Sequence, residues 1–118
     1  MKKVAVLRCL KTSASCAATG CFKAFNNKAN AFERYQGEDV QMIAMWTCNG
    51  CGDSMLENQE GIQKKIERMK LAELDVLHLS ACTSKKNEAG EKVKCPTIAK
   101  IAAELAAAGI EIVDGTHH

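Results

Sequence analysis

The sequence predicts a small α/β domain with a flavodoxin-like parallel sheet of about four strands and helices on both faces. Two observations support this fold class. Four short, mainly apolar segments recur along the 118 residues, and segments with helical spacing separate them. Strands that alternate with helices are typical of parallel sheets, because right-handed crossovers join the strands. We expect the strand order 2-1-3-4 and one domain over residues 1–118, since the chain has the length of one ordinary domain.

The predicted strands lie at residues 4–7, 40–45, 75–79 and 110–113. All four are short and mainly apolar, and the first reads Val-Ala-Val-Leu. Parallel strands that are covered on both faces have near-continuous apolar runs of this kind rather than an alternating pattern. The four segments therefore indicate the buried strands of one central sheet.

Helical patterns occupy the three intervals between these strands. Residues 30–35 are predicted as a helix that could begin as early as Phe22. The segment 54–72 is predicted as a helix because apolar residues recur there at helical spacing, with charged residues between them. Its apolar positions are Met55, Ile62, Ile66 and Met69.

The last predicted helix covers residues 97–108. Pro96 suits its first turn, where a backbone N–H is not needed, and Gly109 suits the left-handed residue that often follows a helix. The helix has one apolar stripe, which consists of Ile98, Ile101 and Leu105. The elements therefore follow one another as alternating strands and helices to the end of the domain.

The overall composition is that of an ordinary globular protein, with a net charge of +2 and 47% hydrophobic residues. No basic run is interleaved with aromatic residues, so we expect no nucleic-acid partner. The apolar run after Lys3 ends at Arg8, which is too short for a signal peptide, and no segment reaches the length of a membrane span. We therefore expect a cytoplasmic protein that does not bind membranes.

Cysteine is unusually frequent, and the seven cysteines are Cys9, Cys16, Cys21, Cys48, Cys51, Cys82 and Cys95. An odd number in a reducing compartment argues against a disulfide framework and indicates metal or thiol chemistry. Three strands run directly into Cys9, Cys48 and Cys82, and His117 follows the fourth. The carboxyl ends of parallel strands share one edge, where open α/β sheets build their sites.

The remaining cysteines fall in the loops that leave this edge. A single free cysteine is usually a small buried apolar residue. That explanation does not account for seven cysteines at one edge of the sheet with none inside a helix. The shared position therefore favours metal coordination or redox chemistry for the group.

Cys48-Asn49-Gly50-Cys51 is the most specific local feature. Two intervening residues let both sulfurs face one ion, at about 2.3 Å for zinc. Asn49 and Gly50 suit the tight turn because both tolerate positive φ. The predicted helix that follows would place its positive end near the sulfurs and lower their pKa. A strand, Cys-x-x-Cys and a helix are also typical of a redox dithiol.

A four-coordinate site needs two further ligands, and Cys82 and Cys95 flank a loop that could supply them. Enough residues then remain for a second site or a cluster: Cys9, Cys16, Cys21 and His117. The leading prediction is a metal-binding protein. Two alternatives stay open, namely an iron–sulfur redox protein and a thiol–disulfide or sulfur-transfer enzyme with Cys48 as nucleophile.

His78 lies within the third predicted strand. Positions in the middle of parallel strands are buried, so we expect a core histidine with hydrogen-bonded ring nitrogens. The alternative is a supporting role, in which the ring donates its N–H to a metal ligand or to a carbonyl group. His117 is the better ligand candidate because it follows a strand at the cysteine-rich edge.

An ordered series of short motifs extends over essentially the whole chain. The series comprises Arg8-Cys9, Cys16, Gly20-Cys21-Phe22, Cys48-x-x-Cys51-Gly52, His78-Leu79-Ser80 with Cys82, Cys95-Pro96 and Gly115-Thr116-His117. In this order the motifs resemble the CGGC-domain family of small bacterial and archaeal proteins. The resemblance implies metal binding through cysteine and histidine, with zinc as the usual suggestion. The central motif departs from the family pattern, because Asn49 stands in place of its first glycine.

Overall fold

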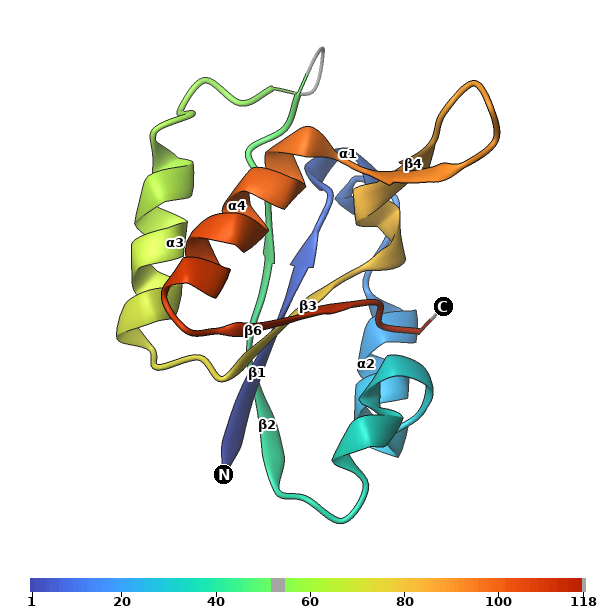
Figure 1. Ribbon diagram of the computed structural model, residues 1–118, viewed down its shortest axis with the longest axis vertical. Helices are drawn as coiled ribbons and strands as arrows, with labels where there is room; N and C mark the ends of the chain where they lie inside the picture. Colours follow the sequence, from blue (N-terminus) through green and yellow to red (C-terminus); the bar gives the residue numbers. More distant parts are fainter. Residues whose placement is uncertain (52–54, 118) are drawn as a thin grey trace.

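The computed structural model describes residues 1–51 and 55–117. Its centre is a four-stranded sheet of β1 (Lys2–Arg8), β2 (Val40–Thr47), β3 (Val76–Leu79) and β6 (Glu111–Asp114), in the order β2-β1-β3-β6 (Figure 1). Neighbouring strands are parallel. Because β6 is the fourth strand of this sheet along the chain, the predicted order 2-1-3-4 is confirmed.

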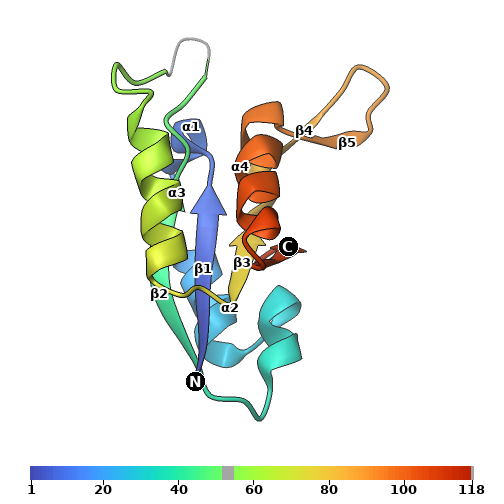
Figure 2. The same cartoon turned by 60° about the vertical axis from the view of Figure 1, so that its left-hand side comes forward.

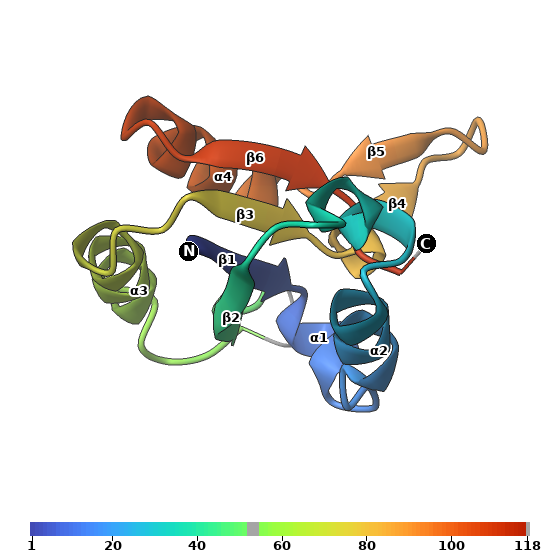
Figure 3. The same cartoon turned by 90° about the horizontal axis from the view of Figure 1, so that it is seen from below.

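Helices cover both faces of the sheet, as predicted (Figures 2 and 3). On one face lie α3 (Gly61–Leu71) and α4 (Pro96–Ala107). On the other face lie α2 (Thr19–Asn27) and the 3₁₀ helix η1 (Asn30–Tyr35). Within the described residues, no helix is long and apolar enough to cross a membrane.

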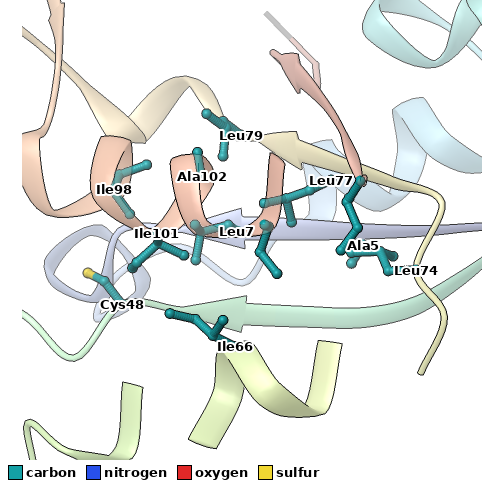
Figure 4. Packing of buried hydrophobic residues seen from close by; sticks show 12 residues of the cluster. Ala5, Leu7, Cys48, Ile66, Leu74, Leu77, Leu79, Ile98, Ile101 and Ala102 are labelled. Atoms are coloured by element: carbon teal, nitrogen blue, oxygen red, sulfur yellow. The ribbon is translucent and has the colours of Figure 1, made fainter. Parts of the chain in front are cut away.

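The hydrophobic core consists of two clusters, one on each face of the sheet. Side chains alternate along a strand, so Ala5 and Leu7 join the cluster beneath α3 and α4, whereas Val4 and Val6 join the cluster beneath α2 and η1. Cys48 belongs to the first cluster (Figure 4). The central Cys-x-x-Cys motif therefore begins inside the hydrophobic core.

The predicted helix over residues 54–72 is wrong in its first part. Residue 54 lies outside the described residues, and residues 55–60 are not helical. Helix α3 begins at Gly61, whose backbone N–H donates to Asn58 Oδ1 at 2.9 Å. A side-chain acceptor of this kind satisfies a free N–H at a helix start. The N-terminus of this helix therefore does not follow Cys51 directly, as the prediction required.

A small antiparallel hairpin was not predicted. Its strands β4 (Ser84–Lys86) and β5 (Lys92–Lys94) form a separate two-stranded sheet that projects beside the N-terminus of α4 (Figures 1 and 2). Asn87 Oδ1 closes the turn by accepting the backbone N–H groups of Ala89 and Glu91. The strands read SKK and KVK, so they lack the apolar alternation that identifies a strand.

His78 is a fully buried core histidine, as predicted. Its Nδ1 lies 2.9 Å from the carbonyl oxygen of Gly115, and its Nε2 lies 2.7 Å from the hydroxyl of Tyr35. A carbonyl oxygen only accepts, so Nδ1 carries the proton and Nε2 accepts from Tyr35. Burial raises the pKa of Tyr35 to about 12, which keeps this hydroxyl protonated. The neutral histidine thus links η1 to the chain segment after β6.

Stability of the metal-free protein is expected to fall below about pH 6.5. Burial lowers the pKa of His78 below 6.5, against a smaller opposing effect of the bond to Gly115. The unfolded chain therefore binds a proton at a pH where the folded chain does not, and acid favours unfolding. Urea unfolding at pH 7.5 and 5.5 measures this difference. His78→Gln should lose this part of the pH dependence, and an unchanged pH dependence would contradict the assignment.

Candidate functional site

The cysteine-rich edge is formed where the parallel strands end. Cys9 directly follows β1, and Cys48 directly follows β2. The backbone N–H of Cys48 donates to the carbonyl oxygen of Arg8 at 3.2 Å, so the two strand ends are joined. Around this edge lie α1 (Leu10–Ser13), the loop after β2, the N-terminus of α4 and the β4–β5 hairpin (Figures 1 and 2).

A pocket of about 450 Å³ opens at this edge. Its lining includes four thiols from three segments of the chain, namely Cys9, Cys48, Cys51 and Cys95. We call it the thiol pocket. Cys48 is buried, Cys9 and Cys95 are half-buried, and Cys51 is exposed. The sulfurs therefore extend from the hydrophobic core to the surface.

Polar groups of the pocket favour negative charge. Lys11 and Lys85 belong to the lining, as does Thr97 in the first turn of α4. Cys95 is the N-cap residue of that helix, where the helix dipole is positive. Thiolates are the form of cysteine that binds metals. The pocket therefore combines its thiols with two positively charged side chains and a helix N-terminus.

Cys9 is the pocket thiol whose charge state is most clearly perturbed. Burial raises its pKa, but the backbone and hydroxyl of Thr12, the backbone of Lys11 and the positive charge of Lys85 outweigh this effect. The net result is a pKa below the ordinary value of cysteine. The sequence signal that could have identified this role is Cys9-x-x-Thr12 directly after a strand, because residues of a first helical turn face the preceding N-cap.

The turn between Cys48 and Cys51 uses one left-handed residue rather than the predicted two. Gly50 has φ 88, whereas Asn49 is not among the described residues with positive φ. Asn49 is instead buried, with 5% of its surface exposed. Its side chain is held by hydrogen bonds to α3 and to the loop before it, and the backbone conformation follows from these bonds.

A second group surrounds Cys21 on the other side of the edge. The thiol of Cys21 donates to Thr116 Oγ1 at 3.4 Å, and His117 Nδ1 lies 3.5 Å from the same sulfur. Cys21 lies in the first turn of α2, so its predicted position in a loop is wrong. The helix begins earlier than predicted because Ala18, with φ 65, turns the chain directly into it.

The two remaining cysteines stand beside these groups. The backbone N–H of Cys9 donates to Cys82 Sγ at 3.4 Å, which places Cys82 next to the thiol pocket but not in its lining. Cys16 Sγ accepts the backbone N–H of Ala18. This N–H, together with the Arg8 guanidinium, lowers the pKa of Cys16 in spite of some desolvation.

The predicted ligands are thus only partly gathered. Cys48, Cys51 and Cys95 line one pocket, and Cys9 rather than Cys82 joins them. Across residues 1–51 and 55–117, no three cysteine, histidine or acidic side chains lie close enough to hold one metal ion. Four cysteine thiols are nevertheless a usual donor set for zinc and for iron–sulfur clusters. Coordination would require the pocket thiols to move closer together.

These features define a small α/β protein with a cysteine-lined pocket at the carboxyl edge of its sheet. The chain belongs to the CGGC domain family, whose model matches residues 3–117. The resemblance inferred from the motifs is therefore confirmed. The chain is also 34% identical over 126 residues to an uncharacterised protein of Methanocaldococcus jannaschii, a match that covers 98% of this chain and 86% of that protein. No solved structure matches.

Proposed function

We propose that this protein binds a zinc ion through the thiol pocket, with Cys9, Cys48, Cys51 and Cys95 as the ligands. The observation that carries the proposal is the meeting of four thiols from three segments in one pocket. Structural zinc sites are commonly tetrahedral, and four cysteines are one of their usual ligand sets. Membership of the CGGC domain family supports a metal-binding role.

The charges around the pocket also support this proposal. Four thiolates around a divalent ion leave a net negative charge, which Lys11 and Lys85 in the lining would offset. The lowered pKa of Cys9 reduces the cost of deprotonating one ligand. Cys48 would provide the fixed ligand because it is buried in the core, and Cys51 would approach from the surface.

Elemental analysis of untagged protein purified without oxygen tests the proposal, together with a visible spectrum of the same sample. We expect about one equivalent of zinc, no visible absorbance and a lower Tm after chelation, because metal binding is coupled to folding. Iron with a band near about 400 nm would instead support the iron–sulfur alternative. Metal-free protein whose Tm does not respond to added zinc would contradict metal binding.

A thiol–disulfide or sulfur-transfer reaction is the second candidate, and one observation favours it. The pKa of Cys9 is lowered, and a thiolate is the reactive form of cysteine. Three further thiols in the same pocket could act as resolving partners. In this candidate function Cys9 would be the nucleophile, in place of Cys48, which the sequence favoured. Turnover of a small disulfide by zinc-free protein, and its loss in Cys9→Ser, would support this candidate.

A further inference from the structure

Lys65 extends from α3 to the end of β2, where the Cys-x-x-Cys motif begins. Its Nζ donates to the carbonyl oxygen of Thr47 at 2.8 Å and to Asn49 Oδ1 at 2.8 Å. These two acceptors belong to the residues on either side of Cys48. Lys65 is half-buried, and hydrogen bonds from a charged donor are stronger than neutral ones, the more so away from water.

Asn49 extends this connection into the loop that follows. Its Nδ2 donates to the carbonyl oxygen of Asn58 at 2.8 Å. The backbone carbonyl oxygen of Asn49 accepts hydrogen bonds from the backbone N–H of Leu56 and from the side-chain amide of Gln59, both at 2.9 Å. Both polar atoms of the Asn49 side chain and its backbone carbonyl oxygen are hydrogen-bonded, so this buried residue has little freedom to rotate. The backbone next to Cys48 is therefore fixed from several directions.

The core places α3 so that Lys65 can make these contacts. Ile66, the next residue on α3, is 2% exposed and packs in the same hydrophobic cluster as Cys48. Burial lowers the pKa of Lys65, and the nearby Cys48 side chain offsets part of this effect, which agrees with their closeness. Lys65 thus places a positive charge against the two residues that flank Cys48.

We infer that Lys65 is a positioning residue of the thiol pocket, which acts through Thr47 and Asn49 to hold the Cys48 sulfur in place. The two contacts fix the backbone on both sides of Cys48, so its side chain is directed before any ligand binds. Only the identification of zinc as that ligand rests on the proposed function. The restraint on Cys48 can be tested in metal-free protein.

The test compares Lys65→Met with Lys64→Met, a matched change at the exposed neighbouring position on α3. The first readout is the rate of Cys48 alkylation by iodoacetamide in reduced, metal-free protein, normalised to Cys95 and followed by mass spectrometry. Loss of the charged bonds should raise this rate by about tenfold in Lys65→Met. Lys64→Met should leave it unchanged, and Lys65→Arg should restore most of the protection.

The second readout is zinc affinity, measured by competition with a chromophoric chelator, and the spectrum of the cobalt-substituted protein. Loss of a residue that orients a ligand should weaken zinc binding about 10–100-fold in Lys65→Met. If wild-type protein binds no metal, the proposed function fails, while the alkylation rates still test the positioning role. Equal rates in Lys65→Met and Lys64→Met would overturn the inference. If Lys65→Met does not fold, Asn49→Ala must give the same rise in Cys48 alkylation.

Discussion

Simultaneous replacement of Cys48 and Cys51 by serine is expected to abolish zinc binding. Serine hydroxyls stay protonated near neutral pH and do not replace thiolates as ligands. The free energy of zinc binding at structural sites is roughly 10–16 kcal/mol. Loss of two of the four ligands should therefore weaken zinc binding by more than about 10³-fold. Chelator competition and zinc content after dialysis measure this loss. The metal-free variant should keep its fold, because Cys51 is exposed and serine preserves most of the Cys48 volume.

Two single variants serve as controls for the ligand assignment. Cys16→Ser changes a thiol that lies outside the thiol pocket, so the variant protein should bind as much zinc as wild type. Cys9→Ser should lose more zinc than Cys82→Ser, because Cys9 lines the pocket and Cys82 lies beside it. Full zinc content in the Cys48/Cys51 double variant would show that the metal binds elsewhere. The Cys21 group would then be the next candidate.

The largest expected effect on stability is that of Phe32→Ala, at about 3–5 kcal/mol of unfolding free energy. Phe32 is completely buried beneath the sheet. Its ring centroid lies 4.4 Å from that of His78 and 5.4 Å from that of Phe25, in an edge-on contact. Truncation would leave a cavity beside a buried hydrogen-bonded histidine, and urea unfolding of the metal-free protein measures the loss.

Phe22→Ala is the matched control, because it removes the same atoms from a ring that is 39% exposed. We expect a change within about 0.5 kcal/mol there. The zinc affinity of folded Phe32→Ala should stay close to that of wild type, since Phe32 and Cys48 belong to clusters on opposite faces of the sheet. Similar losses of stability in both variants would contradict the packing described for α2 and η1.

The central sheet could be predicted from the sequence because its physical cause is local. Strands buried on both faces must be apolar at nearly every position, so β1 and β3 are visible as short apolar runs. The start of α3 could not be predicted in this way. Met55 continues the apolar spacing of that helix, but it is exposed in a loop. Contacts between Asn49 and this loop set its course, and such contacts leave no periodic signal.

The site was predicted in outline for a similar reason. Parallel strands bring their ends to one edge, which explains why Cys9 and Cys48 meet in a pocket with Cys95. Whether Cys9 or Cys82 enters that pocket depends on how the backbone turns after β1 and after β3. The N–H of Cys9 points to the Cys82 sulfur, a spatial relation that spacing does not reveal. The contact between Lys65 and Asn49 is equally invisible, because it joins a helix to a distant turn.

The β4–β5 hairpin gives the molecule a natural attachment point for a reporter. Gly90, with φ 80, lies in its turn, and no atom lies within 4 Å of the position that its Cβ would take. Exposed loop tips of this kind tolerate inserted segments. At the base of the same hairpin, Lys85 lines the thiol pocket. A fluorescent group inserted at the tip would thus be linked through two short strands to the thiol pocket, and no cysteine would be changed.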